Sequence, residues 1–189
     1  MNYNSYIILY DNNLYFKSKD KYFEIHYKKS TLDKGIILDE DDFVKKYLRK
    51  LKDNKLSSFF FNKKLLVIYD NRISKNDFNK LKSAFNNLNY RNIIFKSDVS
   101  LIPLNKKDNY LICSNNYKFL YIDKFNTKKC ITLESTLTDN EINIIVMNRS
   151  IKKNLFIIGN TDRIIYKNTN YYLYDTIIDF FLNIIDSHR

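Results

Sequence analysis

Two aspartates that follow apolar runs are the residues in this chain that come nearest to a catalytic pair. Asp11 follows the run 6–10, and Asp70 follows the run 65–69. These runs are the first and fourth predicted strands, and two carboxylates that lie close together could hold Mg²⁺ for phosphodiester hydrolysis. Aspartate is also an ordinary turn residue, and no third acid accompanies the pair. A magnesium-dependent nuclease therefore stays an alternative hypothesis, and we assign no metal ligands and no catalytic residues.

Other residue types with useful chemistry are scarce and badly spaced for a site. The histidines, cysteines and glycines are His26, His188, Cys113, Cys130, Gly35 and Gly159. Neither histidine has a nucleophile and an acid beside it, so both are interpreted as surface or structural residues. Two cysteines provide neither a disulfide framework nor a zinc site. Two isolated glycines exclude the glycine-rich nucleotide loops.

The acidic cluster 39–42 is interpreted as the start of a helix. It precedes residues spaced as one helix face, namely Phe43, Val44, Tyr47, Leu48 and Leu51. Carboxylates in the first turn of a helix interact favourably with the helix dipole. This explanation is simpler than a catalytic role.

Composition indicates a folded, basic protein. The chain has 189 residues, of which 44% are hydrophobic and 16% aromatic, and its net charge is +11. Such a charge admits a nucleic-acid partner, although lysine greatly outnumbers arginine, the residue that phosphate and base recognition favours. The first residues lack the pattern of a signal peptide, and no apolar run approaches the ~20 residues of a membrane span. We expect a cytoplasmic protein without a membrane span.

The first half of the chain predicts the element order β-β-β-α-β-α-β. Strands are expected at 6–10, 14–17, 22–27, 65–69 and 92–95. Ser74 and Asp77 form a capping arrangement before an amphipathic helix with Phe78, Leu81, Phe85 and Leu88 on one face. A strand, a helix and a strand within about 30 residues form a βαβ unit, whose strands are parallel neighbours.

The second half repeats this order. Strands are expected at 110–113, 118–122, 130–133 and 155–158, and a capping box, Thr138-x-x-Glu141, opens a helix with Ile142, Ile145 and Val146 on one side. A strand or loop over 163–173 precedes a last helix that begins at Asp175. We therefore predict an α/β protein with two related lobes, 1–103 and 104–189.

Three segments resemble the actin-like superfamily, with MreB the nearest in pattern and FtsA and PilM more distant. These segments are 34–39 (KGIILD), 66–74 (LVIYDNRIS) and 90–97 (YRNIIFKS). The resemblance implies two ribonuclease-H-like lobes of β-β-β-α-β-α order. The chain is about half the family's usual length, which implies that the peripheral subdomains are missing.

The departures from the family pattern bear on function. That family holds ATP phosphates with two glycine-bearing turns, and the corresponding residues here are Asp11, Asn12, Asn13, Ser114, Asn115 and Asn116. Only Gly159 remains of the family's adenosine loop. Glycine allows the close backbone approach that a phosphate requires. We therefore expect that the nucleotide site is lost and that the chain has no cofactor and no enzymatic activity.

Clustered aromatic residues predict a protein-binding surface. They are Phe59, Phe60 and Phe61, and Tyr171, Tyr172 and Tyr174. The three phenylalanines could equally cap the core beneath the first helix. The sequence thus favours a degenerate actin-like scaffold or adaptor that binds a protein partner or itself. A basic nucleic-acid-binding protein is the alternative.

Overall fold

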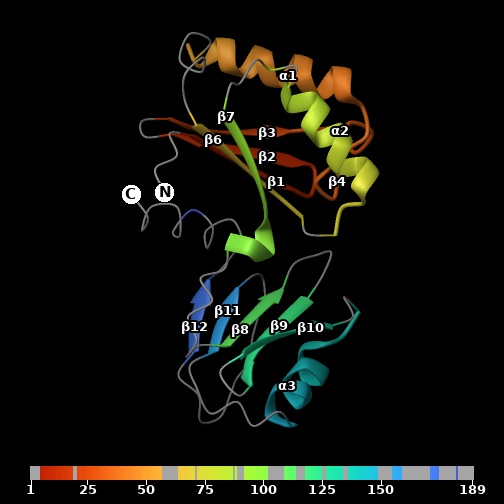
Figure 1. Cartoon of the computed structure of the whole chain (residues 1–189), viewed down its shortest axis with the longest axis vertical. Coiled ribbons are helices and arrows are strands. Elements are labelled where there is room, and N and C mark those ends of the chain that lie inside the picture. Colours follow the sequence, from red (N-terminus) through yellow and green to blue (C-terminus); the bar gives the residue numbers. More distant parts are fainter. Residues whose placement is uncertain are drawn as a thin grey trace. The chain divides into compact units, whose positions relative to one another are not determined.

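The structure is a computed structural model of the whole chain. It describes residues 5–18, 21–56, 64–70, 72–86, 88, 92–101, 109–113, 118–124, 127–133, 136–148, 155–158, 171–174 and 182. The chain divides into two compact units, Met1–Ile102 and Pro103–Arg189. Each unit has its own sheet (Figure 1).

The first unit is built on a five-stranded mixed sheet in the order β3-β2-β1-β6-β7. Its strands are β1 (Ser5–Tyr10), β2 (Asn13–Ser18), β3 (Tyr22–His26), β6 (Lys64–Tyr69) and β7 (Asn92–Ser97). The first three strands form an antiparallel meander, with Ile7 opposite Phe16. β6 runs parallel to β1 and β7 runs parallel to β6. The predicted βαβ unit and its parallel pairing are confirmed.

Two helices cover one face of this sheet (Figure 1). They are α1 (Glu40–Asp53) and α2 (Lys75–Asn86). Asp39 caps α1 by accepting a hydrogen bond from the Asp42 backbone at 3.0 Å. Ser74 caps α2, since its Oγ accepts from the Asp77 backbone at 3.1 Å. α2 thus begins where its capping pattern predicts, and α1 begins at the predicted acidic cluster, of which Asp39 is the cap.

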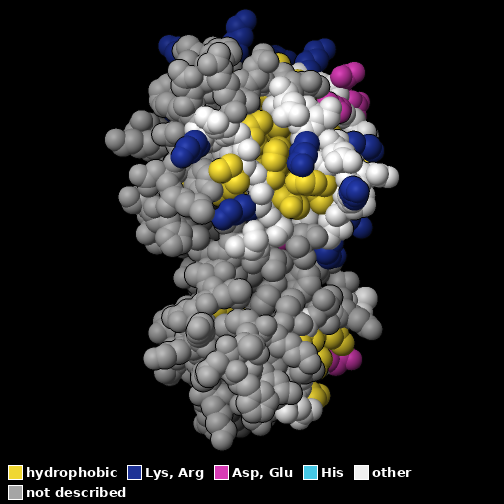
Figure 2. Space-filling model, in the orientation of Figure 1, with side chains coloured by type: hydrophobic (Ala, Val, Ile, Leu, Met, Phe, Trp, Pro, Cys, Tyr) yellow, Lys and Arg dark blue, Asp and Glu magenta, His cyan; other side chains and the backbone are white. Residues whose placement is uncertain are grey.

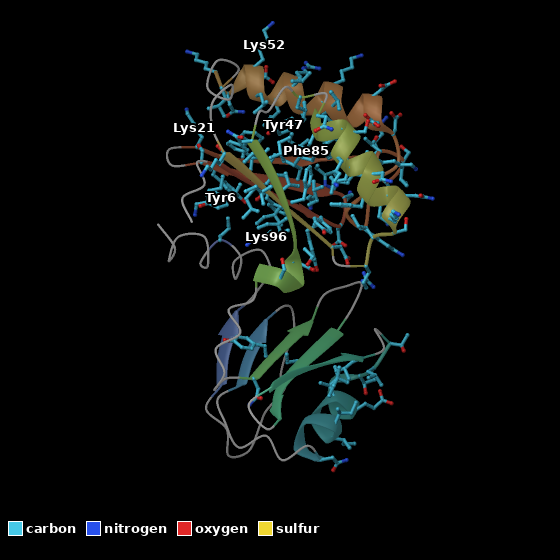
Figure 3. The ribbon with its side chains drawn as sticks, in the orientation of Figure 1. Tyr6, Lys21, Tyr47, Lys52, Phe85 and Lys96 are labelled. Carbon is cyan, nitrogen blue, oxygen red and sulfur yellow. The ribbon has the colours of Figure 1, made fainter. Side chains whose placement is uncertain are left out.

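The core of the first unit lies between these helices and the sheet. Alternate residues of β1, such as Ile7 and Leu9, pack against apolar residues of both helices. Tyr47 and Phe85 are fully buried there and their rings are 6.4 Å apart (Figure 3). Two short strands, β4 (Leu32–Asp33) and β5 (Ile36–Ile37), form a small separate hairpin. A 3-10 helix, η1 (Asp98–Leu101), follows β7.

One predicted core position of the first unit is wrong. Leu48 is 46% exposed, whereas Phe43, Tyr47 and Leu51 of the same helix are buried and Val44 is partly buried. The apolar stripe of α1 is therefore narrower than its sequence indicates. Spacing alone does not distinguish the edge of such a stripe from its centre.

The second unit repeats the strand order of the first. Its strands are β8 (Asn109–Cys113), β9 (Lys118–Lys124), β10 (Thr127–Leu133), β11 (Leu155–Ile158) and β12 (Tyr171–Tyr174). They form a sheet in the order β10-β9-β8-β11-β12, again an antiparallel meander followed by two parallel strands. Each unit therefore has the strand order 3-2-1-4-5 when its main strands are numbered along the chain. The predicted fold class is confirmed.

The single helix described in full in the second unit is α3 (Asp139–Asn148). Its capping box forms as predicted: the Thr138 backbone donates to Glu141 Oε2 at 2.8 Å, and Thr138 Oγ1 accepts from the Glu141 backbone at 3.4 Å. Apart from Leu182, which is helical, the predicted last helix lies outside the described residues. Among the helices described, none has the length and apolar character to cross a membrane.

Candidate functional site at the first turn

The first predicted phosphate turn is a tight connection between β1 and β2. Asp11 and Asn12 form the turn, and Asn13 is the first residue of β2, opposite Tyr10. Asp11 has a φ of 51°, in the left-handed region that aspartate and asparagine tolerate better than most residues. A two-residue hairpin turn of this kind suits the twist of the strands on either side. The turn is thus built without glycine.

The two asparagine side chains connect this turn to the end of β3. Asn12 Nδ2 donates to the Tyr27 carbonyl at 3.0 Å and lies 3.2 Å from His26 Nε2. His26 Nδ1 lies 2.7 Å from Asn13 Oδ1. Since an amide nitrogen can only donate and an amide oxygen can only accept, the imidazole carries its proton on Nδ1. Asn12 Nδ2 and Asn13 Oδ1 are therefore used in hydrogen bonds within the chain.

The hairpin of β4 and β5 closes over the same turn through Gly35. The Gly35 backbone donates to the Asp11 carbonyl at 2.7 Å. Gly35 has a φ of 75°, and a Cβ at this position would lie 3.5 Å from the Leu9 carbonyl oxygen and 3.9 Å from Asp70 Cβ. The first turn, the β4–β5 hairpin and the end of β6 thus meet at one place.

Asp70, the second residue of the hypothetical metal pair, is bound to an arginine. Its side chain is 11% exposed, and Oδ2 lies 2.9 Å from Arg72 Nη2. Oδ1 accepts from the Arg72 backbone at 2.8 Å and from Arg72 Nε at 3.2 Å. Both carboxylate oxygens therefore accept hydrogen bonds from the Arg72 guanidinium. Within the described part of the chain, no group of three or more metal-ligating side chains occurs.

Tyr27 lies next to the first turn and connects this turn to α1. Its hydroxyl donates to the Phe43 carbonyl at 3.2 Å, and its ring stacks on that of Phe43 at 5.0 Å. Burial, and secondly the negative charge of Asp42, raise the pKa of Tyr27 above its usual range. Lys46 lies 5.2 Å above the same ring. Tyr27 therefore fixes the end of β3 against the helix as an uncharged group.

The acidic cluster at the start of α1 is structural, as predicted. Besides the Asp39 cap, Asp42 Oδ2 accepts from Thr31 Oγ1 at 2.6 Å, and Glu40 Oε1 accepts from Ser83 Oγ at 2.9 Å. These bonds connect the first turn of α1 to the segment before β4 and to α2. His26 is likewise structural, through the asparagine network.

Several predicted residues lie where the structure gives no side-chain description. Ser114, Asn115, Asn116 and the three phenylalanines 59–61 lie outside the described residues. Tyr171, Tyr172 and Tyr174 are placed only as members of β12, the edge strand of the second sheet. Their roles as phosphate turn and partner surface stay predictions.

Sequence reasoning missed the importance of Gly35 and Arg72. The scarcity of glycine was a usable signal, since one of only two glycines in the chain marks a position with positive φ. Arg72 gave no comparable signal. Its pairing depends on the local turn after β6, which the sequence indicates only in outline.

Comparison with known proteins gives no match in sequence and several in structure. No protein-family model matches the chain, and no curated protein matches its sequence. A Bacteroides thetaiotaomicron protein described as having an actin-like ATPase fold and unknown function matches with a TM-score of 0.55 and 10% identity, over 96% of this chain and 95% of that chain. The chain has the actin-like fold.

A second actin-like structure matches less completely. MreB5 of Spiroplasma citri bound to AMPPNP matches with a TM-score of 0.50 and 11% identity, over 81% of this chain and 60% of that chain. The actin-like chain therefore spans about three-fifths of the MreB5 length. At these identities the likeness describes the fold alone.

Proposed function

We propose that this actin-like chain is a non-catalytic scaffold or adaptor that acts through contacts with another protein and has lost the nucleotide site of its fold. The observation that carries the proposal is the first turn. Its asparagine side chains bind the end of β3, and the Asp11 carbonyl accepts from Gly35. A phosphate cradle requires backbone N–H groups that point at the ligand and glycines that let it approach.

The end of β6 supports the same proposal. Asp70 has the strand-end position in which a carboxylate could hold Mg²⁺, and it is paired with Arg72. An arginine in this position supplies positive charge without an open coordination site. We therefore place no cofactor and no catalytic residue in the first unit.

Thermal unfolding with Mg-ATP tests the loss of the nucleotide site. A ligand at a hundred times its Kd stabilises a protein by about 2.7 kcal/mol. For a chain of this size that is a rise in Tm of roughly 5–11 °C. We expect the Tm of this chain to be unchanged by millimolar Mg-ATP, Mg-ADP or Mg-AMPPNP.

MreB5 of Spiroplasma citri, which binds ADP and AMPPNP in its structures, provides the positive control. A rise in Tm for this chain comparable with that of MreB5, or phosphate release above background, would show that the site is retained.

The net charge of +11 supports a second candidate, a nucleic-acid-binding protein with or without nuclease activity. Binding through phosphate neutralisation weakens steeply as salt rises. Salt-dependent binding of mixed-sequence RNA or DNA in the absence of any protein partner would favour this candidate over the scaffold.

A further inference from the structure

The face of α1 that points away from the sheet carries three cationic residues around an exposed leucine. Lys45, Arg49 and Lys52 follow one another at spacings of four and three residues, which places them on one side of the helix. Leu48 lies between them in the chain and is 46% exposed. In Figure 3, Lys52 points away from the sheet, whereas Tyr47 of the same helix points toward it. We call Lys45, Leu48, Arg49 and Lys52 the outer row of α1.

The cationic groups of the outer row have no ion-pair partner within the described part of the chain. Asp41 stands four residues before Lys45, at the spacing of a helical ion pair, yet the two are not paired. The same is true of Arg49 and Asp53. Lys46, on the flank of the helix, is by contrast bonded to the end of β3. The charges of the outer row are therefore available to a partner.

Acidic residues limit the outer row at both of its ends. Glu40, Asp41 and Asp42 lie in the first turn of α1, and Asp53 is its last residue. Figure 2 shows Lys and Arg side chains along the top of the first unit, and Asp and Glu side chains at the end where α1 begins. A long nucleic-acid strand that followed the row would bring its phosphates close to these carboxylates, which repel them. A short acidic segment need not reach them.

The exposed leucine and the helix backbone restrict the partner further. Leu48 offers apolar surface, which a protein side chain can cover and a phosphate group cannot. The main chain of α1 is hydrogen-bonded within the helix, so a partner must be recognised through side chains. A second helix presents acidic and apolar side chains together on one face, at the same spacings of three and four residues.

We propose that the outer row of α1 binds an acidic helix of a partner protein. The inference rests on the proposed function, in which the chain acts through protein contacts. The partner helix lies along α1, with acidic residues opposite Lys45, Arg49 and Lys52 and an apolar residue against Leu48. Complementary charges of this kind guide association and fix the register of the two helices.

Charge decides against a second copy of this chain as the occupant. A two-fold symmetric pair places the same surface on both sides of the interface. If such a pair were centred on the outer row, Lys45 of one copy would lie opposite Lys52 of the other, and each chain carries a net charge of +11. An acidic helix neutralises the same groups while it covers the leucine between them.

Selection from a library of helical peptides tests this proposal and does not require that the partner be identified first. Alanine-rich helices of about twenty residues, randomised along one face and displayed on phage, are selected against the whole chain. We expect the enriched helices to carry acidic residues three and four positions apart around an apolar residue. The strongest is synthesised with a fluorescent label, and its Kd is measured by anisotropy. A peptide of the same composition, with its acidic residues scattered around the helix, should bind about tenfold more weakly.

Two matched double variants locate the binding site. Lys45→Glu with Arg49→Glu reverses two charges of the outer row and should weaken the selected peptide about tenfold or more. Lys75→Glu with Lys80→Glu makes the same change in net charge at two exposed residues of α2 and should leave the Kd within about threefold. Circular dichroism checks that both variants are folded. A peptide whose acidic residues are replaced by lysine should bind the first variant more tightly than the wild type.

The substitution Leu48→Ala tests the apolar contact without a change in charge. It should weaken the selected peptide about fivefold, because the apolar surface that the partner helix covers becomes smaller. The side chain is 46% exposed, so the fold should be kept. Ile94→Ala, at a position of β7 that is 40% exposed, is the control and should not change the Kd.

Several outcomes would overturn the proposal. They are a selection without acidic enrichment, equal weakening by both double variants, or equal binding of the scattered peptide. The outer row would be assigned to nucleic acid or to a membrane if single-stranded DNA, or vesicles of phosphatidylserine and phosphatidylcholine, bound more tightly than the peptide and lost binding in the Lys45→Glu, Arg49→Glu variant. The Mg-ATP measurement is independent of all these results, so failure of this proposal and failure of the proposed function are distinguishable.

Discussion

At the scale of single residues, the hydrogen bonds around Asn12 determine what the first turn can do. One amide nitrogen serves both the Tyr27 carbonyl and His26 Nε2, while Asn13 accepts from the opposite ring nitrogen. The imidazole is therefore held between two neighbouring side chains. Glycines in this turn could not make these bonds. Asparagine here contributes stability to the turn that we propose has lost its phosphate-binding role.

Replacing Asn12 with alanine should lower the free energy of unfolding by about 1 kcal/mol, because the Tyr27 carbonyl loses a partly buried donor. Urea denaturation followed by circular dichroism measures the change. Asn79→Ala, at an exposed position of α2, is the control and should be neutral or slightly stabilising. Equal effects of the two substitutions would contradict a structural role for the network.

Gly35 should tolerate asparagine better than alanine. Its φ of 75° costs an alanine about 1 kcal/mol, while the nearest atoms leave room for a Cβ. Asparagine adopts left-handed conformations more readily, so Gly35→Asn should lose less stability than Gly35→Ala. Urea denaturation of both variants measures their free energies of unfolding. If Gly35→Ala were the more stable of the two, steric contact of the larger side chain with Leu9 or Asp70 would be the dominant effect.

The raised pKa of Tyr27 predicts a loss of stability in alkali. The folded chain keeps the Tyr27 proton at a pH where the unfolded chain, with a pKa near 10, releases it. The free energy of unfolding should therefore fall by up to about 1.4 kcal/mol per pH unit above pH ~10 for this group. Below pH ~10 the Tyr27 hydroxyl is protonated in both the folded and the unfolded chain, so the stability that it contributes is fully present there.

Tyr27→Phe should make this alkaline decline shallower, measured by urea denaturation at pH 8, 10 and 11. The same variant loses the hydrogen bond to Phe43, so its stability at pH 8 should be lower. Tyr22→Phe, which removes a hydroxyl at an exposed position of β3, is the comparison. A slope that is the same in all three proteins would show that Tyr27 ionises as readily in the folded chain.

At the scale of elements, the sequence was a good guide wherever local patterns decide the structure. Ser74 and Thr138 cap the helices that they were predicted to open, α1 begins at the predicted acidic cluster, and most of the apolar runs form strands within a residue or two of their predicted ends. The sequence was a poorer guide to burial, which depends on tertiary packing. Leu48 has the spacing of a buried residue and is exposed, because only part of the apolar stripe of α1 packs into the core.

The site was less predictable than the elements. Asp11, Asn12 and Asn13 were identified as a turn, yet nothing local indicates that His26 and Gly35 bind it. These partners are 13 to 24 residues away in the chain and reach the turn only through strand pairing and the β4–β5 hairpin. Long-range hydrogen bonds of this kind depend on the complete fold.

The packing of α2 can be tested by truncating one ring. Phe85 is fully buried and meets Phe43 and Phe95 edge to face at 5.9 and 6.0 Å. Phe85→Leu should lower the free energy of unfolding by about 1–2 kcal/mol through lost contacts and a small cavity. Leu48→Ala should change it by less than about 0.5 kcal/mol, since that side chain is exposed. Similar losses for both would place Leu48 in the core.

At the scale of the whole molecule, the two units share one plan although their sequences differ. Both sheets have the order 3-2-1-4-5, with an antiparallel meander followed by parallel strands. The element order alone predicted this repetition. Which strands are neighbours followed from the resemblance, because connection patterns restrict sheet topologies without selecting one.

The net charge of +11 predicts how copies of the chain behave toward one another. Like charges repel over roughly 30 Å at 0.01 M salt and over roughly 8 Å at 0.15 M salt. The chain should therefore stay in the supernatant on ultracentrifugation at low salt, and any self-association should increase as salt screens the repulsion.

Because the proposed scaffold has no nucleotide site, Mg-ATP should not alter the pelleted fraction at any salt concentration. Sedimentation of MreB5 under the same conditions is the comparison. Pelleting of this chain that requires Mg-ATP would show a nucleotide-dependent assembly and contradict the proposed loss of the site.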